Sequence, residues 1–191
     1  MQEREILDIF IKTGAYKQGH FKLSSGLHSG SYLQCALVLE NPVIAERLCV
    51  ALAQKFKAQE PDVVIGPAMG GIVLAYELAR ALGARALFTE RDDTGKMTLR
   101  RGFYISPNNK VLIAEDVLTT GKSVNEVIEL LRRDSITPIG VTSLVNRSGG
   151  KVNFGGIKCE SLLNLSIPTF DPNDCPLCKE GLAIEKPGSR K

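Results

Sequence analysis

The chain has 191 residues, 24% of them charged and 43% hydrophobic, and its formal net charge is +3. The length suits one domain with a well-buried core, and the composition excludes a disordered or membrane-embedded protein. A charge of +3 is too small to indicate nucleic acid binding, and the uncharged residues 63–76 fall short of the ~20 apolar residues that cross a bilayer. The N-terminus lacks a secretory signal pattern and the five cysteines are an odd number, so we expect a cytoplasmic protein with reduced thiols and no membrane contact.

The first elements along the chain are short. Apolar residues at helical spacing predict a helix over residues 2–12 that stops near Gly14. Residues 21–39 are typical of short strands broken by Ser/Gly turns. Asn41 and Pro42 then provide a helix cap and a first-turn proline for a helix through about Lys57.

From Pro61 the chain alternates between strands and helices. Strands are predicted at 62–66, 84–90, 110–116 and 136–146, helices at 72–82 and 123–133, and a polar loop at 91–102. This order predicts an α/β fold with a mostly parallel sheet flanked by helices, and with ligands at the carboxyl ends of the strands. Beyond Gly149 the alternation ends, and we expect an appendage beside the core.

Residues 121–123, Gly-Lys-Ser, match the end of a nucleotide-binding P-loop. The full P-loop signature needs a glycine five residues before Gly121, and that position is Asp116. A carboxylate there would repel phosphate oxygens, so the P-loop interpretation fails.

Residues 115–123 instead predict a site for a sugar phosphate. Glu115 and Asp116 end an apolar strand, and carboxylates accept hydrogen bonds from a ribose diol. Thr119 to Ser123 directly precede a helix, whose free N–H groups favour phosphate, and Gly121 allows close approach. Together they predict a ribose 5-phosphate site. The alternative is that the acids only cap a turn before an exposed helix start.

The segment VLIAEDVLTTGKS, residues 111–123, resembles the 5-phosphoribosyl 1-diphosphate (PRPP) signature of type I phosphoribosyltransferases. Three further segments resemble orotate phosphoribosyltransferases in order and spacing: HFKLSSGLHSGSYLQC, DVVIGPAMGGIVLA and LVNRSGG. The resemblance implies the type I phosphoribosyltransferase fold in a single domain, residues 1–191. Its core would be about 60–150, with a small hood from about 1–40 and 151–185.

The implied reaction is transfer of ribose 5-phosphate from PRPP to orotate, giving orotidine 5'-monophosphate and pyrophosphate in de novo pyrimidine biosynthesis. The resemblance also implies Mg²⁺ held mainly by PRPP, with no metal ligands on the protein, and a homodimer with shared active sites. The alternatives are a phosphoribosyltransferase for a purine base and a PRPP-sensing regulator on the same fold.

The resemblance assigns site residues by position. Asp116 and Lys96 would be catalytic, Thr119 and Arg147 would bind orotate, and a pyrophosphate loop would contain Ala68, Met69 and Gly70. PRPP would be bound by Arg91, Lys96, Glu115, Asp116, Val117, Leu118, Thr119, Thr120, Gly121, Lys122 and Ser123.

The loop 91–101 corresponds to a lid that closes over the site and often reaches the neighbouring subunit, and Lys96 is our choice for the cation that meets the leaving group. The alternative is that residues 91–101 form a mobile, solvated loop without a role in the site. The chain differs from many orotate enzymes in its shorter lid, in Ser24 where they have lysine, and in Met69-Gly70 where they have a Tyr-Lys pair.

Cys175-Pro-Leu-Cys178 has the spacing of half a zinc site. The chain has no second such pair, and its two histidines, His20 and His28, are distant in sequence. We therefore expect no metal here unless another subunit completes the site, and we expect His28 to be solvated in a turn.

Overall fold

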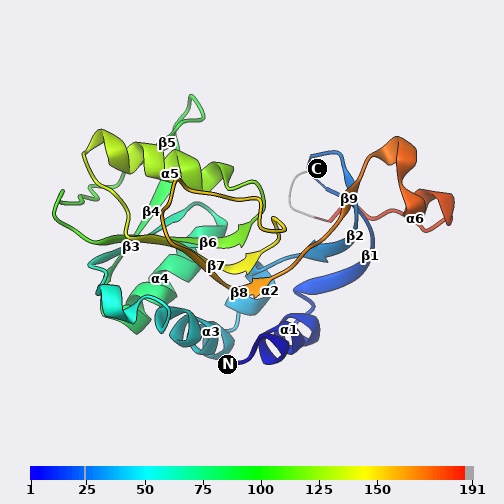
Figure 1. The fold of residues 1–191 in the computed structure, drawn as a ribbon, viewed down its shortest axis with the longest axis horizontal. Helices are drawn as coiled ribbons and strands as arrows, with labels where there is room; N and C mark the ends of the chain where they lie inside the picture. Colours follow the sequence, from blue (N-terminus) through cyan, green and yellow to red (C-terminus); the bar gives the residue numbers. More distant parts are fainter. Residues whose placement is uncertain (24, 188–191) are drawn as a thin grey trace.

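A six-stranded sheet forms the centre of the computed structural model, which describes residues 1–23 and 25–187 (Figure 1). The strand order is β5-β4-β3-β6-β7-β8, and every neighbouring pair is parallel except β4 and β5. The parallel alternation predicted from Pro61 onward is confirmed. The strands are β3 (Val63–Pro67), β4 (Arg85–Arg91), β5 (Met97–Thr98), β6 (Val111–Leu118), β7 (Gly140–Asn146) and β8 (Cys159–Asn164).

Helices cover both faces of this sheet. α5 (Lys122–Arg133) lies on one face, and α3 (Pro42–Ala53) and α4 (Gly70–Leu82) lie on the other (Figure 1). Successive side chains of β3 point to opposite faces of the sheet. Val64 packs in the hydrophobic cluster with α3 and α4, whereas Val63 and Ile65 pack in the cluster with α5. The central sheet is therefore buried on both faces.

Helix ends follow the predicted signals. The Asn41 side chain accepts hydrogen bonds from the backbone N–H groups of Val43 and Ile44, and Gly83 ends α4 in the left-handed conformation. One prediction in this region was wrong. Residues 36–39, expected as strand, form the single helical turn α2 (Ala36–Leu39), which buries Val38 and Leu39 on one side. A 3-10 turn, η1 (Lys57–Gln59), follows α3.

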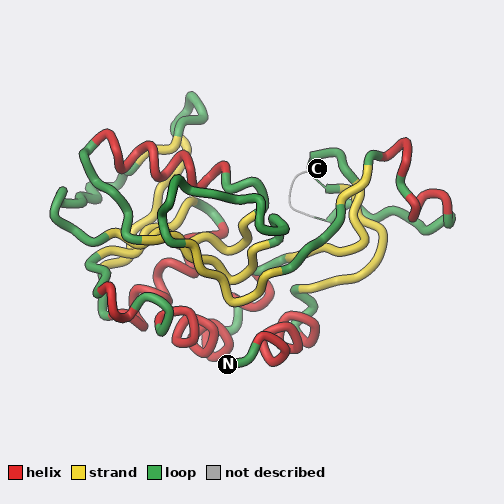
Figure 2. The backbone as a smooth tube through the Cα atoms, in the orientation of Figure 1, coloured by secondary structure: helices red, strands yellow, loops and turns green. Residues whose placement is uncertain are grey.

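A second, smaller sheet stands apart from the first (Figure 2). It contains β1 (Tyr16–Lys22), β2 (His28–Leu33) and β9 (Thr169–Phe170), all antiparallel, and α1 (Glu3–Lys12) precedes it. After β9 come η2 (Pro172–Asp174) and α6 (Pro176–Lys179). We call this small sheet with η2 and α6 the hood. The C-terminal boundary differs from the predicted 151, because β8 buries Leu162 and Leu163 as the edge strand of the central sheet.

The chain order places two loops side by side. β3 and β6 are neighbours in the sheet, although the chain visits β4 and β5 between them. The order reverses at this pair, and ligands of open parallel sheets bind at such a switch point, beyond the carboxyl ends of the strands. In the described part of the chain, no helix is both long and apolar enough to span a membrane.

Candidate functional site

The acidic pair lies at the carboxyl end of β6. Asp116 Oδ1 accepts a hydrogen bond from the Val117 backbone N–H at 2.9 Å, which holds the carboxylate at the strand tip. Glu115 is its neighbour along the strand, and its Oε1 accepts from the Asp116 N–H at 3.3 Å. Both side chains are partly buried at the point where two loops meet.

Gly70, at the start of α4, lies directly against Asp116. A Cβ atom built on Gly70 would stand 2.6 Å from Asp116 Cγ and from both of its carboxylate oxygens. The preceding peptide, Ala68–Met69, is cis, and the Ala68 N–H donates to the Thr89 carbonyl at 2.7 Å. The structure therefore brings the predicted loop residues 68–70 together with the acidic pair.

The same turn depends on two other glycines. A Cβ on Gly66 would lie 2.2 Å from the Gly71 carbonyl oxygen, and one on Gly71 would lie 2.9 Å from the Ala114 carbonyl oxygen. The backbones of β3, α4 and β6 touch here without side chains between them. Close packing of backbones is therefore the reason for glycine at positions 66 and 71.

Gly121 fixes the turn before α5. Its φ of 72° lies in the left-handed region, and a Cβ would meet Val152 Cγ1 at 2.8 Å and Phe154 Cε1 at 3.0 Å. Thr119 and Thr120 are exposed, and the Lys122 N–H at the start of α5 donates to the Thr120 hydroxyl at 3.4 Å. The predicted phosphate turn therefore lies at the N-terminus of the twelve-residue helix α5.

Two predicted PRPP contacts have side chains that face the core. Leu118 is almost fully buried and packs with the α5 cluster, and Val117 is partly buried against the other cluster. These positions offer a ligand only their backbone groups.

Glu115 has a strongly raised pKa. Burial, reinforced by the neighbouring Asp116, raises the pKa of Glu115 to about 9. Glu115 therefore keeps its proton near pH 7 in the ligand-free protein.

Tyr32 and Arg147 extend the site from two other elements. Arg147 follows β7, and burial lowers the pKa of its half-buried guanidinium, while Tyr32 raises it. Burial raises the pKa of Tyr32, while Arg147 lowers it and Asp116 raises it, so Tyr32 interacts electrostatically with both groups. Tyr32 was missed in the sequence, although it stands inside the segment SGSYLQC.

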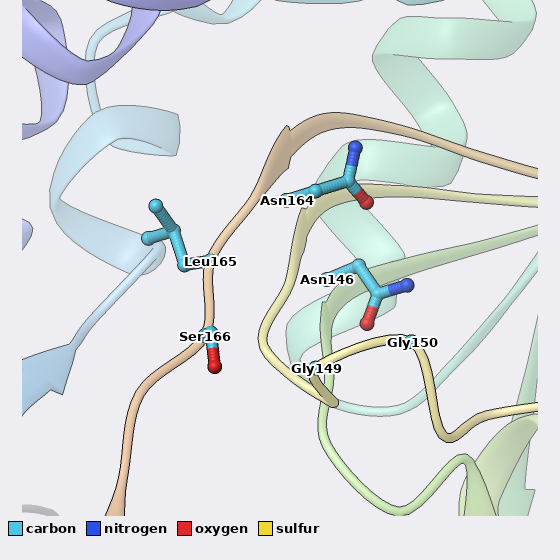
Figure 3. Close-up of a pocket in the computed structure, with 6 residues that line it drawn as sticks. All are labelled: Asn146, Gly149, Gly150, Asn164, Leu165 and Ser166. Atoms are coloured by element: carbon cyan, nitrogen blue, oxygen red, sulfur yellow. The ribbon is translucent and has the colours of Figure 1, made fainter.

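A small cavity of about 250 Å³ is lined by residues that precede and follow Arg147 in the chain (Figure 3). It lies between the turn after β7 and the chain leaving β8. The Asn146 side-chain oxygen accepts from the Ser148 N–H at 3.0 Å and so shapes that turn. The lining residues are Asn146, Gly149, Gly150, Asn164, Leu165 and Ser166. The volume lies below the roughly 300–1,000 Å³ of typical drug-sized ligand sites, which suits a small ligand.

The expected lid is a short hairpin. β5 pairs with the end of β4, and Asp92 Oδ1 accepts from the Thr94 N–H, the Thr94 hydroxyl and the Lys96 N–H within the tip. The tip projects from the sheet beside α5 (Figure 1). A solvated loop was expected without strand structure, but β5 closes it because Met97 is buried in the α5 cluster.

The two cationic residues of the hairpin that were predicted to bind PRPP, Arg91 and Lys96, have different surroundings. Arg91 forms an ion pair with Glu126 of α5 and donates to the Gly95 carbonyl at 2.7 Å. Lys96 is exposed, and no described side-chain contact joins it to Asp116 or to the turn before α5. The structure thus does not gather Lys96 into the site of its own chain. Ser24 lies outside the described residues.

The histidines differ from the expectation. His28 is only 6% exposed, so its predicted solvation in a turn was wrong, and its Nδ1 lies 3.0 Å from Nε2 of His20. Both approach Cys175 and Cys178, which the sequence had placed far apart from them.

Comparison with known proteins agrees with this geometry. Residues 38–153 match the family model described as "Phosphoribosyl transferase domain". The chain is 54% identical over 191 residues to an orotate phosphoribosyltransferase of Desulforamulus reducens, covering 100% of this chain and 99% of the relative. It is 53% identical over 191 residues to an orotate phosphoribosyltransferase of Pelotomaculum thermopropionicum, with 100% of both chains covered.

A solved structure shares the fold. The orotate phosphoribosyltransferase of Aeropyrum pernix superposes with a TM-score of 0.71 at 27% identity, covering 84% of this chain and 93% of that one. The family match over residues 38–153 contains the acidic pair, the glycine-rich turn and Arg147. The chain belongs to the phosphoribosyltransferase family, in the branch of the orotate phosphoribosyltransferases, as its signature predicted.

Proposed function

We propose that the protein transfers ribose 5-phosphate from PRPP to N1 of orotate, releasing pyrophosphate and forming orotidine 5'-monophosphate. The observation that carries this proposal is the contact between Asp116 and Gly70, because it joins a sugar-binding acid to a backbone turn at the switch point of the sheet. The named relatives act on orotate, and the similarity over the full chain supports the same base here.

The ligand's two ends have separate partners in this arrangement. The N–H groups before α5 meet the 5-phosphate, and the helix dipole favours its charge. Asp116 accepts the ribose hydroxyls at the end of β6. The pyrophosphate then lies over residues 68–70, whose backbone can approach it closely because Gly70 has no side chain.

Charge develops at the ribose during transfer. As the bond from C1 to pyrophosphate breaks, the sugar becomes positive and the leaving group more negative. Asp116 stabilises the sugar through its hydroxyls. Neutral Glu115 limits the negative charge that faces the departing pyrophosphate.

The site residues fit Mg²⁺ held mainly by substrate. Mg²⁺ prefers one or two carboxylates together with phosphate oxygens and water, and the end of β6 offers Asp116 with Glu115 beside it. Asp116 would hold the ion through the ribose hydroxyls. When bound, Mg²⁺ neutralises charge on the pyrophosphate.

Arg147 is the recognition group for orotate in this proposal. Its planar guanidinium can donate two parallel hydrogen bonds to a carboxylate, and its partly buried position strengthens them. Among the described residues, no carboxylate lies within ion-pair distance of Arg147, which leaves the guanidinium available for substrate. Tyr32 interacts electrostatically with Arg147, and the Arg147 backbone N–H donates to the carbonyl of Leu118, the residue before Thr119.

Lys96 completes the site in a homodimer. The hairpin carries Lys96 away from Asp116 of its own chain, so we assign it to the active site of the neighbouring subunit, where it would meet the departing pyrophosphate. Both sites of the dimer are then shared, and the enzyme works in the cytoplasm in de novo pyrimidine biosynthesis.

The test is product formation. Purified protein with PRPP, Mg²⁺ and orotate should release pyrophosphate and form orotidine 5'-monophosphate in equal amounts. PRPP binding without turnover would instead favour the regulatory alternative.

A further inference from the structure

Four potential metal ligands meet in the hood. His20 comes from β1, His28 begins β2, and Cys175 and Cys178 flank the start of α6. One ligand atom from each lies within 4.8 Å of every other, although up to 158 residues separate them in sequence. Figure 1 shows why: β9 pairs with β2, and the chain then turns through α6 back toward β1.

The distances within this cluster match a tetrahedral ion. Zinc bonds of about 2.3 Å to sulfur and 2.0–2.1 Å to nitrogen place neighbouring N and S atoms about 3.6 Å apart and two N atoms about 3.3 Å apart. The cysteine sulfurs lie 3.6 and 3.7 Å from His20 Nε2, and Cys178 Sγ lies 3.4 Å from His28 Nδ1. The two nitrogens are 3.0 Å apart. These four of the six edges agree with the tetrahedron to within about 0.3 Å, and the two remaining pairs, Cys175–His28 and Cys175–Cys178, lie within 4.8 Å.

Hydrogen bonds alone do not account for the arrangement. His20 Nδ1 lies 2.8 Å from the Leu182 carbonyl oxygen, which can only accept, so Nδ1 carries the proton. In the neutral ring, Nε2 then has one lone pair, yet His28 Nδ1 and both sulfurs converge on it. A cation accepts one lone pair from each of the four groups. The carbonyl on Nδ1 is also the outer-shell partner that metal-bound histidines usually have.

The C-terminal part of the hood, residues 171–187, has few buried side chains that could stabilise it. Among residues 171–187, Cys175 is the one buried side chain, and Leu182 and Ile184 are 49% and 46% exposed. α6 buries no other residue, and its single turn is too short to be stable alone. Backbone bonds at Lys22, His20 and Glu185 attach only the far end of this segment. Small substructures of this kind commonly depend on a disulfide or a metal.

We propose that His20, His28, Cys175 and Cys178 bind one structural Zn²⁺ that fastens α6 to the β1–β2 hairpin. Two thiolates and two neutral imidazoles are a preferred zinc set, and binding releases the two thiol protons to solvent. All four positions of the tetrahedron come from the protein, which leaves no position for a substrate or an activated water. The site is separate from Asp116 and does not depend on the proposed reaction.

Metal analysis of the full-length, untagged protein is the direct test, because a histidine tag would bind zinc itself. After growth with zinc, we expect about one zinc per chain, and at least a tenfold lower content in Cys178→Ser and in His28→Gln. Cys159→Ser is the matched control, because Cys159 is a thiol outside the cluster, and it should retain the metal.

Cobalt spectroscopy keeps the test valid if these variants fail to fold. Wild-type protein stripped by a chelator and titrated with Co²⁺ should show strong tetrahedral ligand-field bands and a thiolate charge-transfer band, saturating at one equivalent. Stripping should also lower the melting temperature by on the order of 10 °C, and Zn²⁺ should restore it.

Three results would overturn the proposal. These are wild-type protein that neither contains zinc nor gives the cobalt bands, zinc content unchanged in both ligand variants, and a Cys175–Cys178 disulfide in protein isolated without reductant, found by thiol titration and mass spectrometry.

Discussion

The carboxylate of Asp116 rests against the backbone of Gly70, so closely that a methyl group on Gly70 would lie 2.6 Å from both carboxylate oxygens. Gly70 begins α4, just after β3, and Asp116 lies 46 positions later near the end of β6, the strand beside β3. Their contact fixes the acid where a ribose and its leaving group would meet.

Asp116→Asn should lower phosphoribosyl transfer by ~10²–10⁴-fold, because the amide keeps the shape but loses the negative charge that stabilises the sugar. Steady-state kinetics with PRPP and orotate measure the loss, and circular dichroism checks the fold. Asp8→Asn, an exposed acid on α1, is the control and should act as wild type. Near-normal turnover of Asp116→Asn would remove this acid from the mechanism.

Gly70→Ala should lower kcat/KM by ~10–100-fold by displacing the Asp116 carboxylate, since small misplacements of a catalytic group are costly. Gly30→Ala is a matched control, because its added Cβ meets no atom closer than 3.9 Å. Equal kinetics for the two variants would show that the close contact has no role in positioning Asp116.

Local signals in the sequence predicted much of this site. The Asn41 cap, the Gly83 stop and the strand, turn and helix around Gly121 each depend on a few adjacent residues, and each is present. The shape of the lid hairpin and the helical turn at residues 36–39 depend on packing with distant segments, which periodicity does not encode. The pairing of His20 with Cys175 joins positions 155 residues apart and follows only from the folded hood.

Arg147→Lys should raise the KM for orotate by ~10–100-fold and leave PRPP binding nearly unchanged. Lysine keeps the charge but not the two parallel donors, and a charge-assisted hydrogen bond contributes roughly 1.5–3 kcal/mol. Arg133→Lys, at the exposed end of α5, controls for loss of a guanidinium elsewhere. A larger effect on PRPP than on orotate would assign Arg147 to the other substrate.

Glu115→Gln should stabilise the ligand-free protein increasingly as pH rises. In the folded protein the pKa of Glu115 is about 9, above its ordinary value of 4.5, so wild-type stability falls as pH rises between these values. Glu115→Gln removes this loss of stability. Its free energy of unfolding should exceed that of the wild type by up to about 4 kcal/mol at pH 7.5 and by almost nothing at pH 4.5. Urea unfolding across this range measures it, and a pH-independent difference would contradict the assigned protonation.

Lys96→Ala should lower the single-turnover rate more than the affinity for PRPP, because the cation acts on the departing pyrophosphate. Lys12→Ala, an exposed lysine in the last turn of α1, should change neither.

Mixing Lys96→Ala with Asp116→Asn subunits tests the shared site. If Lys96 serves the partner, hybrid dimers regain one intact site, and a statistical mixture recovers about a quarter of wild-type activity. A mixture as inactive as its parents would place Lys96 and Asp116 in the same chain's site.

The most direct test of the central claim compares bases under one condition: PRPP and Mg²⁺ with orotate, uracil, hypoxanthine, guanine or xanthine, following pyrophosphate release. The account predicts turnover with orotate and a kcat/KM for each other base that is lower by at least ~10³-fold, because only orotate offers a carboxylate to Arg147. Turnover with a purine at a comparable rate would contradict the assignment of the base site.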